Sequence, residues 1–413
     1  MERKKLVRTF AALFLATATA RLGLGIIAPI LPLYADTFSA GGLEIGLVFA
    51  AFSVSRAIFG PFVGRLSDQI GRKPLIVAGL VGYAAVSLLY ASAGSLWELG
   101  IYRFLQGIAA VLVTPIAQAY VGDLIPKGKE GRYANLFYAS QFLGLAIGPM
   151  LGGGIGAAWS YEAAFYVMGG LTLIALVLVL VTVPADRSLR DTLQTARRQV
   201  RRGALPETRR TFAALLRNDA VKAIFAYVGT RGFWRSSFTT FYPLFATASL
   251  GASEANVGLV LSAYMFAEAA VQVPAGFLAD RFPRVRQIVV ASILAPLALI
   301  AVPWLKTTSA VLGAAVFMGT FSALGRASLV AIRTELGRTH GMATLAGLQG
   351  SAFSAGQMLG PILSGIVVDA FGDASAFPFG FVVGAFGSVM VIRWTRRWLR
   401  TDPEAPAISR SRG

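Results

Sequence analysis

The sequence predicts an all-α membrane protein with twelve transmembrane helices in two pseudo-symmetric six-helix bundles. Three observations lead to this prediction: apolar residues occur in long runs, basic residues are confined to alternate loops, and the sequence repeats itself halfway along the chain. Of the 413 residues, 55% are hydrophobic and 14% are charged, whereas about a quarter of the residues in a soluble domain are charged. The composition therefore excludes an ordinary soluble protein.

The apolar runs are long enough to cross a bilayer. A hydrocarbon core about 30 Å thick needs roughly 20 apolar residues per helix. The first run is too long for the core of a signal peptide, so we expect it to be a retained helix. The predicted spans are residues 10–34, 43–64, 75–93, 97–121, 134–156, 161–183, 220–247, 255–278, 287–304, 308–332, 343–369 and 376–393.

The position of the basic residues accounts for the net charge of +18. Apart from Lys306 and the arginines inside predicted spans, every lysine and arginine lies in a terminus or in every second loop, or, for Lys222, at the edge of a span next to such a loop. Cytoplasmic loops carry such an excess, so both termini are expected in the cytoplasm, and a nucleic-acid-binding role is disfavoured. The Ala-, Arg- and Gly-rich composition is typical of a prokaryote, which makes the expected location the plasma (inner) membrane.

The two halves of the chain repeat one another at a constant offset of 212 residues. The matching features are Gly64-Arg65-Leu66-Ser67-Asp68 with Gly276-Phe277-Leu278-Ala279-Asp280, Gly144, Gly148 and Pro149 with Gly356, Gly360 and Pro361, and Asp123 with Glu335. We therefore predict bundles at 1–183 and 219–395, a cytoplasmic linker at 184–218 and a tail at 396–413. Parallel six-helix halves are a known transporter plan with a substrate site near the midplane.

The segment Gly64-Arg65-Leu66-Ser67-Asp68-Gln69-Ile70-Gly71-Arg72-Lys73-Pro74 joins the second and third predicted spans. Its two glycines permit a tight reversal of the chain. Asp68 can pair with Arg72, and a charge pair at a helix end can hold one conformation and release in another. Gly64, Asp68, Gly71 and Arg72, with Asp280 in the second half, are therefore the predicted gating latch.

This segment closely resembles the signature of the major facilitator superfamily between its second and third helices. Three further segments resemble motifs of its drug:proton antiporter branch: Leu22-Gly23 with Pro29-Ile30-Leu31-Pro32, Leu99 with Arg103 and Gln106-Gly107, and Gly144 with Gly148-Pro149 and Gly152-Gly153. The resemblance covers essentially the whole chain. It implies alternating access by rocking of the halves, a role for Arg103 in proton coupling, and export by antiport. The second-half loop departs from the signature because it lacks the second glycine and the lysine.

The fifth-helix motif also has a direct physical interpretation. Glycines allow helices to pack closely in a membrane, and proline bends a helix. Gly144, Gly148, Pro149, Gly152 and Gly153 are therefore predicted to pack closely against another helix. Their second-half counterparts Gly360 and Pro361 are predicted to do the same.

Several arginines fall inside the predicted spans and face a single embedded acid, Glu268. A charge at mid-membrane costs at least about 2.5–3.5 kcal/mol, so each needs a partner, a wet cavity or a route to the interface. Arg231 and Arg235 share a helix face. Through the offset of 212 residues, Arg21 corresponds to Phe233, which lies midway between them. We predict that the substrate is an anionic or zwitterionic small molecule, with amphiphiles among the candidates, and that it is bound by Arg21, Arg56, Arg231, Arg235 and Arg326.

Two alternatives to this interpretation remain open. The arginines can be paired internally or with lipid phosphate, and Arg326 can extend to the interface along its helix. The aromatic residues that could line a cavity also occur commonly in helix packing. They are Phe52, Tyr138, Phe142, Trp234, Tyr242, Tyr264 and Phe353.

Glu268 is the predicted proton-coupling residue, together with Arg103. Burial favours a protonated carboxyl and a neighbouring guanidinium favours the carboxylate, so a change in either can drive proton uptake or release. The alternative is a static ion pair. With no cysteine and a single histidine, no metal is expected, and no cofactor is expected beyond the coupling proton.

The predicted function is proton-coupled export of a small molecule by a functional monomer embedded in the lipid bilayer. The alternatives are a polyspecific exporter of cationic or neutral drugs, and a symporter or uniporter of organic anions. A sensor on a transporter scaffold is disfavoured because no large soluble module is present. An enzyme is not expected, and the sequence has no Gly-x-x-x-x-Gly-Lys loop of an ATP-driven pump.

Overall fold

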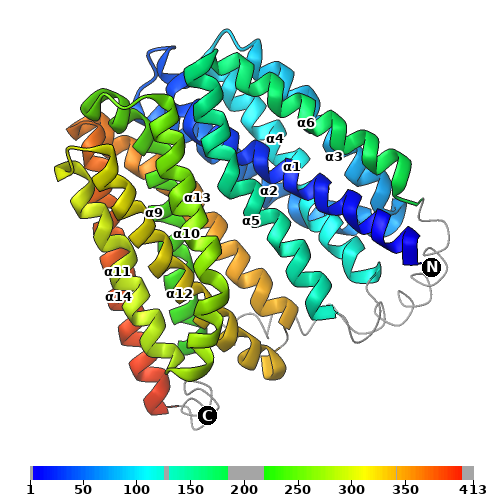
Figure 1. Cartoon of the computed structure of the whole chain (residues 1–413). Helices are drawn as coiled ribbons and strands as arrows, with labels where there is room; N and C mark the ends of the chain where they lie inside the picture. The colour runs from blue at the N-terminus through cyan, green and yellow to red at the C-terminus, as the bar shows by residue number, and fades with distance from the viewer. Residues whose placement is uncertain (1–2, 125–129, 185–217, 341, 402–413) are drawn as a thin grey trace. The chain divides into compact units, whose positions relative to one another are not determined.

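The fold was analysed in a computed structural model, which describes residues 3–124, 130–184, 218–340 and 342–401. Within these ranges every regular element is helical (Figure 1). The first-half helices are α1 (Arg3–Asp36), α2 (Gly42–Ile70), α3 (Arg72–Ala91), α4 (Leu96–Leu124), α5 (Glu130–Ala158) and α6 (Tyr161–Thr182). The second-half helices are α9 (Asp219–Leu250), α10 (Glu254–Arg281), α11 (Arg284–Ala301), α12 (Thr308–His340), α13 (Met342–Phe371) and α14 (Ala376–Thr401), with short 3₁₀ turns η2 (Val302–Trp304) and η3 (Asp373–Ser375).

Eleven of these helices are long and apolar enough to cross a membrane, counted over the described residues. The remaining long helix, α9, has 32 residues but is not among them. It carries Arg231, Arg235 and several serines and threonines. Its length and position match the predicted seventh span, so α9 completes the set of twelve helices despite its polarity.

The described residues divide into two compact units. The first contains α1, α3 to α6, α2 from Leu47 onward, and the start of α10 up to Ser262. The second contains the remaining described helices and the segment Gly41–Gly46. The predicted linker at 184–218 lies almost wholly outside the described residues, and α14 continues to Thr401.

The same kind of helix contact occurs in both units. In the first, α1 packs along α5, and in the second, α9 packs along α13. A Cβ atom on Gly148 would overlap the backbone of Gly25 on α1, and one on Gly360 would overlap the carbonyl of Phe233 on α9. The predicted glycine motifs are therefore the surfaces at which these helix pairs approach closely.

Each unit has its own apolar core. Leu13, Tyr83 and Val113 belong to the first core, whereas Val228 and Trp398 belong to the second. In the second unit α9 also packs against α14, and α11 packs against both α12 and α14 (Figure 1). This packing sets the rotation of α9 and so determines which neighbours its arginines meet.

Candidate functional site

Glu268 on α10 lies among three arginines of the second unit. Its side chain is buried, with 3% of its surface exposed, and Arg231 is almost as buried at 6%. Arg231 Nη2 donates a hydrogen bond to Glu268 Oε1. Arg326 Nη1 lies 3.4 Å from the same oxygen, and Arg235 Nη1 lies 3.7 Å from Oε2. One carboxylate is therefore shared by three guanidinium groups.

Close helix packing brings these residues together. A Cβ atom on Gly319 of α12 would contact the Tyr264 carbonyl and the Glu268 nitrogen, so glycine allows α12 to approach α10. One turn further along α12, Ser322 accepts a 2.8 Å hydrogen bond from Arg231 Nε. Arg231 is thus fixed by α10 on one side and by α12 on the other.

Arg326 is oriented toward the cluster and not toward the end of its helix. Its Nε donates to Gln272 Oε1 at 2.7 Å, and its Nη1 faces Glu268. Gln272 lies one turn after Glu268, so both partners project from the same face of α10. The alternative in which Arg326 extends along α12 to the interface is therefore not the arrangement in this structure.

Two predicted aromatic residues contact the same arginines. The Arg231 guanidinium carbon lies 5.5 Å from the Phe353 ring centre, and that of Arg235 lies 5.6 Å from the Tyr264 ring centre. Such contacts stabilise a cation by roughly 0.5–2 kcal/mol. They leave hydrogen-bonding capacity on the guanidiniums, because a ring face occupies none of their N–H donors.

The first-unit arginines have different partners. Arg21 Nη2 donates to Gln141 Oε1 at 3.0 Å, and Arg103 Nη1 donates to Gln106 Oε1 at 2.8 Å. Arg56 and Arg103 both lie over the Phe52 ring. Arg21 and Arg103 thus hydrogen-bond to amide oxygens, and Arg56 and Arg103 contact aromatic rings, in contrast to the carboxylate-centred cluster of the second unit.

Uncharged partners are what the sequence prediction missed. Gln272 and Ser322 were not singled out, although each lies four residues from a charged member of the cluster, Glu268 and Arg326 respectively. Gln106 was visible inside the fourth-helix motif, three residues after Arg103. Helical spacing from an embedded charge is the signal that would have found all three.

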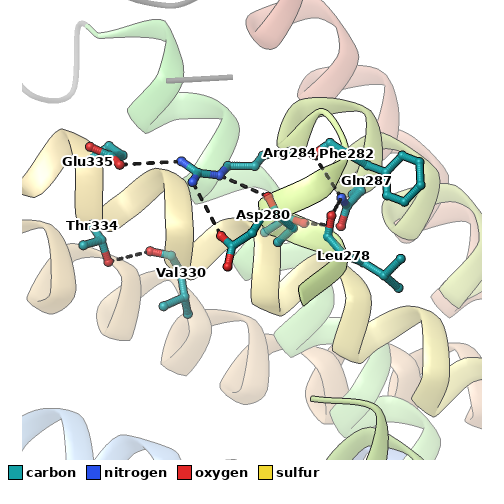
Figure 2. A network of polar contacts seen from close by, with 10 residues as sticks. Leu278, Asp280, Phe282, Arg284, Gln287, Val330, Thr334 and Glu335 are labelled. Carbon is teal, nitrogen blue, oxygen red and sulfur yellow. Dashed lines mark hydrogen bonds and ion pairs between the residues drawn. The ribbon is translucent and has the colours of Figure 1, made fainter. Parts of the chain in front are cut away.

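Asp280 is the second-unit member of the predicted latch. There, Arg284 connects two acidic residues, Asp280 and Glu335 (Figure 2). Its Nη2 lies 3.8 Å from Asp280 Oδ1 and its Nη1 lies 3.8 Å from Glu335 Oε1. Arg284 Nε also donates to the Ala279 carbonyl at 3.3 Å. Gln287 anchors the same loop by donating to the carbonyls of Leu278 and Phe282. Asp280 therefore takes part in a charge network at the junction of α10 and α11.

In the first unit, only part of the predicted latch is described. Gly71 separates α2 from α3 and has a φ of 95°, which favours glycine. Gly64 instead lies inside α2, because the helix continues to Ile70, so a single glycine makes the reversal. Arg72 begins α3, whereas the Asp68 side chain lies outside the described part of the structure.

The packing motif residues lie on the helices predicted for them. Gly144, Gly148 and Gly152 each face the backbone of α1. Pro149 and Gly153 lie in α5, while Gly360 and Pro361 lie in α13. No group of three or more potential metal ligands was found among the described residues.

The Major Facilitator Superfamily profile matches residues 13–248 and 223–413. The chain belongs to the major facilitator superfamily. It is thus a multi-pass membrane transporter with the major facilitator fold.

Known relatives and structures agree with this assignment. Multidrug resistance protein 1 of Bacillus subtilis is 26% identical over 402 residues, covering 95% of this chain and 97% of that protein. An uncharacterized transporter of the same type from Methanocaldococcus jannaschii is 36% identical over 174 residues, but the match spans only 42% of this chain and 45% of that protein. A bacterial homologue of the human lysosomal transporter Spinster, in an inward-facing and unoccupied conformation, superposes with a TM-score of 0.78 at 15% identity over the full length of both chains. At that identity the likeness concerns the fold.

Proposed function

We propose that this major facilitator protein is a proton-coupled secondary transporter of a small organic anion. In this proposal Arg231, Arg235 and Arg326 bind the anionic group, and Glu268 carries the coupling proton. The observation that supports it most directly is the three-to-one ratio of guanidiniums to carboxylate around Glu268. We further propose that both termini lie in the cytoplasm, as the distribution of basic residues predicts.

The chemistry of the cluster favours an anion over a cation. Guanidinium groups present paired N–H donors that match carboxylate, phosphate and sulfonate oxygens. A cationic drug would have to approach three positive charges and would find a single carboxylate already shared among them. A zwitterion could bind through its anionic end, so this substrate class stays within the proposal.

In this proposal, Glu268 is the internal counter-ion of the three arginines when no substrate is bound. The anionic group of the substrate and the Glu268 carboxylate compete for the same guanidiniums. Because breaking a buried pair leaves an uncompensated charge at a cost of about 3–5 kcal/mol, displacement of Glu268 is favourable only if its charge is neutralised. Protonation of the displaced carboxyl achieves this.

Two coupling modes follow from different observations. Export by antiport, the first candidate, is supported by the fifth-helix motif and by the name of the full-length Bacillus relative, a multidrug resistance protein. Symport of an anion with a proton is the second candidate. It is favoured by the Glu268 geometry, because an anion that displaces the carboxylate promotes proton binding, whereas antiport requires substrate and proton to exclude each other.

Binding is tested first, with purified protein in detergent and matched panels of anionic, zwitterionic and cationic amphiphiles. A ligand that binds only the folded protein raises its unfolding midpoint by mass action. We expect anions to raise the midpoint in the wild-type protein and to lose this effect in Arg235→Ala. Stabilisation by cations alone would refute the anionic substrate class.

The direction of proton movement is tested in proteoliposomes that contain a pH-sensitive dye. An inward gradient of a stabilising anion is applied with equal pH on both sides. Antiport makes the lumen more alkaline as the anion enters, and symport makes it more acidic. Anion entry with no pH change would show uniport and would refute proton coupling without affecting the anion site.

A further inference from the structure

A groove between α11 and α14 contains two further arginines, which do not belong to the Glu268 cluster. The groove encloses about 320 Å³. Its walls combine two arginines, Arg286 and Arg396, with the apolar side chains of Val285, Val289, Ile392 and Leu399. This volume is at the lower end of the range of about 300–1,000 Å³ seen for ligand pockets, and the groove is an open one with an apolar wall and a few polar groups.

The two groove arginines have no acidic partner among the described residues, unlike Arg284 and Arg397 close to them in the chain. Arg397, next to Arg396 in the chain, lies 3.1 Å from Asp219. Arg284, two residues before Arg286, lies between Asp280 and Glu335 (Figure 2). No acid of the described residues therefore compensates the positive charges of Arg286 and Arg396, and both arginines line the same groove.

The groove also lies at the ends of two candidate membrane spans. The candidate membrane spans run from Arg284 to Trp304 in α11 and from Asp373 to Thr401 in α14. Arg286 is near the start of the first span and Arg396 near the end of the second. The two helices meet at their basic ends, where basic pockets between transmembrane helices bind anionic headgroups.

We propose that this groove binds one anionic phospholipid of the surrounding bilayer. The lipid phosphate contacts Arg286 and Arg396, and the upper part of an acyl chain lies against Val289 and Ile392. A free phosphate ion would leave the apolar wall unused, whereas a zwitterionic lipid would supply no net charge to balance two arginines. The proposal does not depend on which substrate the protein transports.

The test uses the full chain reconstituted in nanodiscs of phosphatidylglycerol and phosphatidylcholine at equal amounts. The protein is then released from the nanodiscs, and native mass spectrometry identifies the lipid that stays bound to it. We expect the wild-type protein to retain one phosphatidylglycerol in preference to phosphatidylcholine. The double substitution Arg286→Gln and Arg396→Gln is expected to reduce that retention by about tenfold or more, since each direct hydrogen bond from a charged group to the phosphate contributes on the order of tenfold.

The matched control is Arg393→Gln with Arg400→Gln. Both residues are exposed on α14, and their loss removes the same charge without altering the groove. The control is expected to retain phosphatidylglycerol as the wild type does. Equal loss in both double variants would show a diffuse electrostatic effect, and equal retention of the two lipids would show no headgroup selectivity. Either result would overturn the proposal.

Misfolding is checked by the unfolding midpoint in lipid-free detergent. Because both groove arginines are exposed, the midpoint is expected to stay unchanged in the double variant.

Discussion

Arg326 Nη1 lies 3.4 Å from Glu268 Oε1 while Arg326 Nε donates to Gln272 one turn further along α10. The guanidinium therefore connects α12 to two successive turns of α10. Arg326 is more accessible than Glu268, with 20% of its side chain exposed against 4%. In the proposed function, this combination makes Arg326 the member of the cluster expected to exchange an internal partner for a substrate group.

We predict that Arg326→Gln weakens anion binding by about tenfold or more, because a hydrogen bond to a charged group contributes about 1.5–3 kcal/mol. The measurement is the concentration of a stabilising anion that produces half of the midpoint shift. Arg333→Gln is the control, since Arg333 is also on α12 and also donates to a glutamine, Gln349, at 2.9 Å. Equal weakening by both substitutions would contradict a specific role for Arg326.

A second prediction concerns Glu268→Gln. Without the carboxylate, three guanidiniums are left with no internal counter-ion, so the unfolding midpoint without ligand is expected to fall. Anions should then produce a larger upward shift than in the wild type, because their competitor is gone. Transport of the anion should no longer move protons in the dye assay.

Glu268→Asp is the matched control for this prediction, because it keeps a titratable carboxyl at the same position. It should preserve the direction of proton movement at a reduced rate. If Glu268→Gln still drives uphill transport from a pH gradient, Glu268 is not the coupling residue. In that case the ion pair with Arg231 has only a structural role.

The sequence predicted the fold well because its strongest signals are physically direct. Apolar run length gave the spans, and the constant repeat offset predicted that Gly148 and Gly360 would mediate equivalent helix contacts, as they do. The helix α9, which is too polar to count as a span by composition, was also predicted, as the span at residues 220–247. Its polarity is explained by the partners that Arg231 finds on α10 and α12.

The candidate site was less predictable because it depends on helix rotation. Sequence spacing placed Arg231 and Arg235 on one face of α9, but it did not specify which helix that face meets. The contact with Glu268 depends on close approach at glycines such as Gly319, and neither charge nor hydropathy records such contacts. Partners such as Gln272 carry no charge, so their residue type alone did not distinguish them from other embedded polar residues.

The charge network at Arg284 gives a third prediction, on the relative contribution of its two acids. Both lie 3.8 Å from the guanidinium, but the Asp280 side chain is 72% exposed and that of Glu335 is 23% exposed. Exposed pairs contribute only about 0–1 kcal/mol because solvent screens them. Glu335→Gln should therefore lower the unfolding midpoint more than Asp280→Asn does. If the two substitutions lowered the unfolding midpoint equally, both in low salt and in high salt, exposure would not govern the contributions of the two acids.

The glycine contact between α1 and α5 gives a fourth prediction with an internal control. Gly148→Ala places a Cβ atom against the backbone of Gly25, which cannot move aside as a flexible side chain would. Overpacking of this kind costs about 1–3 kcal/mol, so the variant should show a lower unfolding midpoint and a reduced yield of folded protein. Gly154→Ala, on the same helix, meets no atom within 4 Å and should be close to neutral. A normal midpoint for Gly148→Ala would contradict this close contact, because α1 and α5 would then have room for the methyl group.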